Sequence, residues 1–143
     1  MAQIISATTR FAGAGAGTRR ADFILKARAL LAQAVDYRAD GEWDLALEVA
    51  FQAALRTAGA RISASPVAAR RRRPSNAWDQ LRLVDEDGVR WATEFSQYSR
   101  LRSRVSSGLD LSVDHDVVNR VMELAAQFLA EVEEEAGWLP AAA

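Results

Sequence analysis

The spacing of the apolar residues is the feature that most constrains the fold of this chain. Between residues 114 and 136 two neighbouring stripes repeat every three or four positions: Val117, Val121, Leu124, Phe128 and Val132 form one, and Val118, Met122, Ala125 and Leu129 form the other. Residues at this spacing share one face of an α-helix. No segment alternates apolar and polar residues over a useful length with the period of two that a strand requires. The pattern predicts an all-α fold.

Helical spacing recurs in earlier parts of the chain. Helices are predicted at about 19–38, 42–62 and 89–105, and a short one is predicted to follow Ser75, its expected N-cap. The first two are joined by only a few residues, and short connections favour antiparallel neighbours. We therefore expect an up-and-down antiparallel helical bundle of four main helices plus one short helix. Trp43 and Trp91 fall on apolar helix faces and are expected in its core.

Length and composition favour a single domain. The chain has 143 residues and no cysteine, which excludes disulfides and cysteine-based sites. We predict a disordered N-terminal tail over 1–18, which includes a glycine–alanine stretch, then the bundle over 19–136 and a C-terminal tail over 137–143. No apolar run reaches the roughly 20 residues of a membrane span, and the N-terminus lacks the apolar segment of a signal peptide. These features predict a cytoplasmic protein without membrane contact.

The last helix carries more apolar surface than a bundle helix normally needs. We predict that one of its two stripes is buried in the bundle and that the other meets a second copy of the chain. Homodimerisation through the first or last helix is the resulting hypothesis. The predicted interface residues are Val118, Met122, Ala125 and Leu129.

A run of four arginines is the strongest pointer to a binding function. It comprises Arg70, Arg71, Arg72 and Arg73, and it lies between Pro66 and Pro74 in the longest connection of the chain. Four adjacent like charges repel one another and favour an anionic partner. Trp78 follows closely, as a core anchor for this connection or as a stacking platform for a base. We take the four arginines and Trp78 as candidate binding residues for RNA or an acidic protein.

Charge is unevenly distributed, which leaves a structural alternative open. Residues 49–78 contain six arginines and no acid, whereas residues 110–136 contain eight acids and one arginine. The arginine run could therefore pair with Glu133, Glu134 and Glu135, within the fold or across a dimer. Those three glutamates lie near the negative end of their helix, so we expect them to have cationic neighbours.

Few residues here are suited to catalysis. His115 is the only histidine, and it lies between Asp114 and Asp116 at the expected start of the last helix. Adjacent helical residues point about 100° apart, so these three do not form a converging site, and we expect His115 to be an exposed polar residue. The Glu-x-x-His pairs of helical di-iron proteins are missing. We predict no metal site and no cofactor.

The segment Arg72-Arg73-Pro74-Ser75-Asn76-Ala77-Trp78, together with the helix pattern over about 21–136, resembles the HEPN superfamily, and most closely an actinobacterial HEPN-like branch. The resemblance implies a bundle of four main helices with an extra short one, usually dimeric. Many HEPN proteins cut RNA or accompany nucleotidyltransferases in toxin–antitoxin pairs.

The ribonuclease motif of that superfamily is not matched. It consists of an arginine, four to six residues and a histidine. The required positions before His115 hold Gly108, Leu109 and Asp110, and Arg104 is separated from His115 by ten residues. The nuclease chemistry therefore transfers to no residue of this chain.

These observations leave three hypotheses. The leading one is a non-enzymatic HEPN-like helical binding module, homodimeric, that contacts nucleic acid or an anionic protein surface through the arginine run. The alternative is a nucleic-acid-directed enzyme, ribonuclease-like or a toxin–antitoxin component, with an unrecognised site that uses arginines for phosphate and His115 for proton transfer. The third is a structural dimer whose charges only pair with one another.

Overall fold

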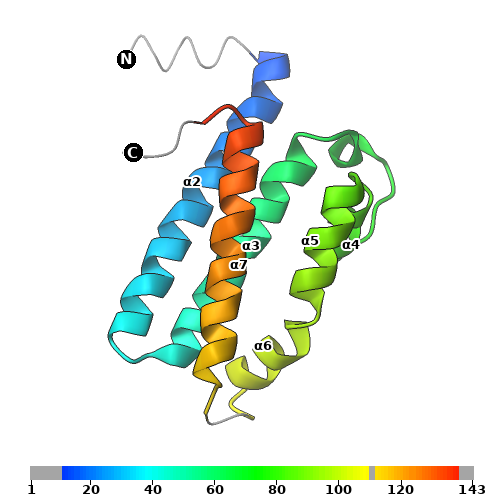
Figure 1. The fold of residues 1–143 in the computed structure, drawn as a ribbon. Coiled ribbons are helices and arrows are strands. Elements are labelled where there is room, and N and C mark those ends of the chain that lie inside the picture. The colour runs from blue at the N-terminus through cyan, green and yellow to red at the C-terminus, as the bar shows by residue number, and fades with distance from the viewer. Residues whose placement is uncertain (1–10, 110–111, 139–143) are drawn as a thin grey trace.

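Long helices run up and down along one another in the computed structural model, which describes residues 11–109 and 112–138. In chain order the elements are α2 (Phe11–Ala39), α3 (Trp43–Ser63), the 3-10 turn η1 (Pro66–Ala69), α4 (Ala77–Arg82), α5 (Glu86–Ser96), α6 (Ser99–Ser106) and α7 (His115–Glu135). Figure 1 shows α2, α3, α5 and α7 side by side. No strand occurs in the described residues, so the predicted all-α bundle is confirmed.

The hairpin of α2 and α3 is the most extensive helix pair. Its turn contains Gly41, whose φ of 79° is in the left-handed region that glycine adopts without strain. Further along the pair, Gly59 lies against the ring of Phe23, where an added Cβ would come within 2.8 Å of a ring carbon. The absence of a side chain at Gly59 therefore lets the two helices approach closely. The predicted hairpin is confirmed.

The first helix begins earlier than the sequence suggested. We expected a disordered tail through residue 18, whereas the backbone is helical from Phe11. Glycine costs only about 1 kcal/mol per position relative to alanine in a helix, and propagation from an established helix is far easier than nucleation. Residues 1–10 of the predicted tail lie outside the described part.

The short helix α4 is capped one residue later than predicted. The side chain of Asn76, not that of Ser75, accepts hydrogen bonds from the backbone N–H groups of Trp78 and Asp79, at 2.8 and 3.3 Å. Asn and Ser are similarly good N-caps, so propensity alone does not distinguish the two positions.

The helix predicted over 89–105 is two helices. α5 ends after Ser96, and the chain turns at Gln97 and Tyr98 before α6 begins. The turn brings Arg102 of α6 onto Glu48 of α3, with two hydrogen bonds of 2.9 and 2.8 Å. The apolar spacing continues across the turn, which is why the sequence pattern does not reveal it.

Aromatic side chains from four helices form the centre of the core. Trp78 stacks on Phe95 with ring centroids 5.1 Å apart, and Trp91 stacks on Phe128 at 4.8 Å. Phe51 meets both Trp78 and Phe95 edge-on. Offset-stacked and edge-to-face pairs are the favoured aromatic geometries. Trp91 is thus in the core as predicted, whereas Trp43 is only partly buried at the edge of the bundle.

Both apolar stripes of α7 are covered within a single chain. The residues predicted to form a dimer interface have exposed fractions of 0% for Val118, 4% for Met122, 1% for Ala125 and 5% for Leu129. α7 packs against α2 and α3 on one side and against α5 through Trp91 and Phe128 on the other. Three neighbours within the chain account for its wide apolar arc, so these four residues pack mainly in the core of one chain.

Candidate functional site: the arginine link

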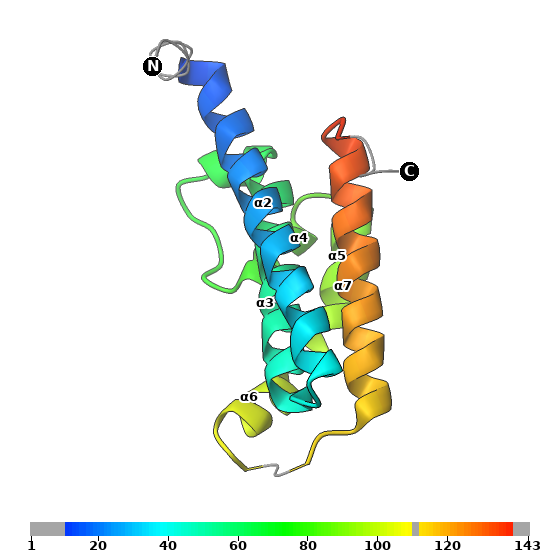
Figure 2. The ribbon, with the colours of Figure 1, turned by 90° about the vertical axis from the view of Figure 1, so that its left-hand side faces the viewer.

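The four arginines lie on an exposed connection that we call the arginine link, residues 70–75. It joins η1 to α4, and Figure 2 shows it along the side of the bundle that faces away from α7. All four arginines are exposed. The link therefore presents its charges to solvent on a side of the molecule where the acidic helix α7 does not lie.

Both ends of the arginine link are fixed to the bundle. Before it, the Ser65 hydroxyl accepts a hydrogen bond from the backbone N–H of Val67 and so caps η1. After it, the Gln80 side chain donates to the Pro74 carbonyl at 2.6 Å, and Asn76 caps α4. These contacts leave the four arginines between two anchored points.

Trp78 is an anchor and not a stacking platform. Its side chain is only 4% exposed, and its ring stacks on Phe95 and meets Phe51 edge-on. A base would need to displace these core contacts to reach the ring. Of the two roles considered for Trp78, the structure supports the first: it holds the start of α4, and with it the arginine link, against the core.

The link arginines lack acidic partners in the described part of the chain. Among the described residues their one side-chain hydrogen bond runs from Arg73 Nη1 to the Ala68 carbonyl at 3.3 Å. Other arginines behave differently: Arg28, Arg61 and Arg102 each form an ion pair with a glutamate or aspartate. No acid of residues 11–109 or 112–138 therefore neutralises the four charges of the link.

The acidic end of α7 is neutralised by other arginines. Arg28 of α2 donates to Glu133, and Arg61 of α3 donates to Glu135. One turn earlier, Arg90 of α5 lies 3.4 Å from Glu131. The expectation of cationic neighbours is thus confirmed for Glu133 and Glu135, but within one chain their partners are not the link arginines.

Arg61 joins three parts of the fold. Its guanidinium donates two hydrogen bonds to Asp85, of 2.8 and 2.9 Å, and two to Glu135, of 3.0 and 2.9 Å. Asp85 also caps α5 by accepting from the Gly88 N–H at 2.7 Å. Because the Arg61 side chain is only 8% exposed, these four bonds satisfy a nearly buried cation. In the sequence Arg61 is one of six arginines in the basic segment 49–78, and no local pattern predicts this role.

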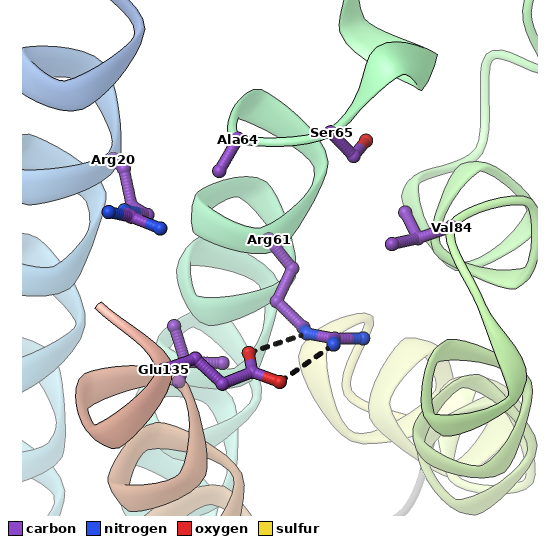
Figure 3. A pocket seen from close by; sticks show the side chains of 7 residues that line it. Arg20, Arg61, Ala64, Ser65, Val84 and Glu135 are labelled. Carbon is purple, nitrogen blue, oxygen red and sulfur yellow. Dashed lines mark hydrogen bonds and ion pairs between the residues drawn. The ribbon is translucent and has the colours of Figure 1, made fainter. Parts of the chain in front are cut away.

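A pocket of about 170 Å³ lies beside this arginine, between α2 and the C-terminal ends of α3 and α7. Figure 3 shows Arg20, Ser65 and Val84 around it, with Glu135 hydrogen-bonded to Arg61. The two cations that line the pocket, Arg20 and Arg61, are matched by Glu135 in the lining and by Asp85 bound to Arg61, so the pocket presents no concentrated positive charge.

The paired carboxylates predict a loss of stability in acid. Hydrogen bonds from Arg61 hold the pKa of Asp85 below its ordinary value, and hydrogen bonds from Arg102 do the same for the pKa of Glu48. When the pKa of a carboxyl is lower in the folded than in the unfolded state, its ionised form stabilises the fold. That contribution is complete above the unfolded pKa, roughly 4, and is lost as the pH falls through the folded pKa.

We expect the free energy of unfolding, measured by urea titration, to decline below about pH 4. In an Arg102→Met variant the decline should be smaller, and an equal decline would show that the Glu48 pair does not contribute.

His115 does not belong to a catalytic arrangement in the described residues. Its ring is stacked on Trp43, with centroids 3.8 Å apart and planes 10° apart, and the residue is exposed as expected. Asp114 caps α7 by accepting from the Asp116 N–H at 2.8 Å. His115 lies at the start of α7, near the beginning of α3, whereas the link follows the opposite end of α3 in the chain (Figure 1). The histidine and the link arginines therefore do not share a site.

One group of carboxylates has spacing suited to a cation. Oxygens of Asp87, Glu131 and Glu135 lie within 4.8 Å of one another. Each of the three carboxylates is ion-paired with an arginine: Asp87 and Glu131 with Arg90, and Glu135 with Arg61. We therefore do not assign a metal site to this group.

Comparison with known proteins supports the family suggested by the sequence. No curated protein and no solved structure matches the chain. A family model described as SAV_6107-like HEPN matches residues 39–133, which run from the end of α2 to near the end of α7 and include the whole arginine link. The match covers about two thirds of the 143 residues. The chain therefore belongs to the SAV_6107-like HEPN family.

Proposed function

We propose that this protein is a binding module that contacts a polyanionic partner through Arg70, Arg71, Arg72 and Arg73. The observation that carries the proposal is the contrast between these arginines and the paired ones. Arg28, Arg61 and Arg102 are paired with acids of the same chain, whereas the four link arginines are exposed and have no acidic partner in the described residues. Bringing four like charges together costs energy that an external anion can offset.

Nucleic acid is the polyanion that we propose. A guanidinium can donate two parallel hydrogen bonds to one phosphate, and each phosphate contact releases counterions. Since Trp78 is buried, no aromatic face of that residue is available for base stacking. Contacts of this kind position a backbone without reading bases, so we expect binding with little sequence preference.

The arrangement favours binding over catalysis. The link arginines extend from an exposed connection, while His115 is stacked on Trp43 near the opposite end of α3. An enzyme that used the arginines for phosphate and His115 for proton transfer would need both groups within reach of one substrate atom. The geometry gives that alternative no support.

Fluorescence anisotropy of a labelled single-stranded RNA tests the proposal. Four phosphate contacts predict a log–log salt slope of about −3, so that affinity falls about 50-fold between 50 and 200 mM salt. Replacing the four arginines with alanine should remove this binding without changing the circular dichroism spectrum. A folded protein that binds no RNA at low salt, or an alanine variant that binds as well as wild type, would contradict it.

We further propose that the protein forms a homodimer through a groove between α2 and α7. The groove has a volume of about 340 Å³ and is lined by Leu31 and Val35 of α2 and by Met122 and Ala126 of α7. Val35 is 45% exposed, although it is apolar. The lining also includes Arg38 and Glu123. In a two-fold contact the same patch meets itself, so each arginine can face the glutamate of the other copy.

Placing a charge in the groove should dissociate this dimer. Ala126 and Gln127 are both exposed on α7, but only Ala126 lines the groove. We expect wild type and Gln127→Arg to be dimers and Ala126→Arg to be a monomer, as measured by light scattering coupled to gel filtration. Burying an unpaired arginine in an apolar contact costs several kcal/mol, which supplies the effect. A monomeric wild type, or a dimer that persists in Ala126→Arg, would overturn the proposed interface.

A further inference from the structure

Ser75 is an exposed serine directly downstream of the four arginines. Pro74 separates it from Arg73, so arginines occupy the positions two to five residues before it. Its hydroxyl has no hydrogen-bond partner in the described residues, because the cap of α4 is Asn76. Nothing in the fold therefore requires this hydroxyl.

The backbone around Ser75 differs from that around the other candidate serines. Pro74 cannot lie in a helix interior, and it disfavours helical geometry at the residue before it, so the segment stays open. Ser65 also neighbours the arginines, but its hydroxyl is used, donating to the Ile62 carbonyl and accepting from Val67. Ser103 has an arginine three residues before it but lies within α6. Ser75 combines a free hydroxyl, non-helical backbone and preceding arginines.

We infer that Ser75 is a phosphorylation site for a serine kinase that recognises arginines before its target, and that the phosphate neutralises the arginine link. In the transfer, Ser75 Oγ attacks the γ-phosphorus of ATP, the bond to the β–γ bridging oxygen breaks, ADP leaves, and the hydroxyl proton passes to a base of the kinase. A kinase with an acidic substrate surface would hold the arginines while the open segment places Ser75 at the reacting phosphate. The second half of this inference rests on the function proposed above.

The consequence for the arginine link follows from its charge. Phosphoserine carries about −1.5 to −2 charges at neutral pH and three acceptor oxygens, so the link would change from four positive charges to about two. Arg73 and Arg72 lie two and three residues before the phosphate in sequence, close enough to form charge-assisted hydrogen bonds with it. The guanidiniums would then be occupied in the same chain, and affinity for RNA should fall about tenfold.

The first experiment uses the full-length protein, ATP with Mg²⁺ and the catalytic subunit of cyclic-AMP-dependent protein kinase, a kinase that prefers preceding arginines. Peptide mass spectrometry should locate one phosphate at Ser75 in wild type and in the Ser65→Ala and Ser103→Ala controls. Ser75→Ala should take up none, and Arg72→Ala combined with Arg73→Ala should slow uptake at least tenfold. No uptake by wild type, or equal uptake by Ser75→Ala, would overturn the modification site.

Two further measurements test whether the phosphate on Ser75 neutralises the arginine link. Trypsin cleaves after arginine, so phosphorylated protein should be cut at the link several-fold more slowly than unmodified protein, and this result requires no RNA. The anisotropy assay should show the tenfold loss of affinity. If unmodified protein binds no RNA while uptake and trypsin protection are as expected, the proposed function fails and the modification site stands. Equal trypsin rates in the two forms would overturn the pairing of phosphate with the arginines.

Discussion

Replacing Gly88 with alanine is expected to destabilise the protein by about 3 kcal/mol. Gly88 lies in the first turn of α5, where the backbone of α5 passes the end of α4. A Cβ built on it would lie 2.1 Å from the Leu81 carbonyl oxygen and 3.1 Å from the Leu81 carbonyl carbon. Both are backbone atoms, so a rotamer change cannot relieve the overlap. The α4–α5 junction would have to open, which would strain the cap hydrogen bond between Asp85 and the Gly88 N–H.

Gly41→Ala is the matched control for this substitution. Gly41 has a φ of 79° and nothing within 4 Å of an added Cβ. Alanine there should cost only the left-handed backbone strain, about 1 kcal/mol. Urea unfolding followed by circular dichroism compares the two variants directly. Equal stabilities of the two variants would show that the close approach at Gly88 is not the origin of its cost.

Removing the Arg61 guanidinium is expected to cost about 2 kcal/mol. Arg61→Met keeps much of the aliphatic length but loses four hydrogen bonds to Asp85 and Glu135. A fully buried ion pair that loses one partner costs about 3–5 kcal/mol. Here Asp85 is 44% and Glu135 41% exposed, so water can solvate the carboxylates that remain, and the loss should be smaller. Arg61→Lys should not restore wild-type stability, because a single ammonium cannot reproduce two bidentate contacts.

Arg56→Met controls for loss of charge on the same helix. Arg56 is exposed on α3, and its side chain has no ion pair or hydrogen bond in the described residues, so its replacement should change stability by less than about 0.5 kcal/mol. A double-mutant cycle that combines Arg61→Met with Asp85→Asn should give a coupling energy of about 1 kcal/mol or more. Additive effects of the two substitutions would mean that the contact contributes nothing to stability.

The fold was predictable from the sequence because helical apolar spacing is a local property. The stripe of α7 and the hairpin of α2 and α3 could both be predicted without knowing what they pack against. The break between α5 and α6 could not, because the apolar spacing continues across it and the contact of Arg102 with Glu48, 54 residues earlier, leaves no local pattern. Gly88 falls just before the helix predicted over 89–105, whereas it lies inside the first turn of α5.

The candidate site was only partly predictable. A run of four arginines next to proline indicates an exposed link from composition alone, and the structure places it there. The role of Arg61 depends on partners 24 and 74 residues away, which no local pattern reveals. The width of the apolar arc on α7 suggested a second copy, but it is covered by α2, α3 and α5 of the same chain. An apolar pattern shows that a face is buried, and not which surface buries it.

The described helices include none long and apolar enough to cross a membrane. Arg28 of α2, Arg61 of α3 and Arg90 of α5 pair with glutamates of α7, whereas the link arginines have no acidic partner among the described residues. The presence or absence of an acidic partner therefore separates the arginines that stabilise the fold from those that are available to a binding partner.

The most direct test of the account compares two variants that lose the same number of positive charges. One replaces the four link arginines with alanine; the other replaces Arg19, Lys26, Arg56 and Arg100, exposed cations scattered over α2, α3 and α6. Affinity for labelled single-stranded RNA is measured by fluorescence anisotropy at low salt. The account predicts that the link variant loses binding while the scattered variant retains affinity within a few-fold of wild type. Equal losses in both variants would mean that net charge, and not the arginine link, binds RNA, and would contradict the central claim.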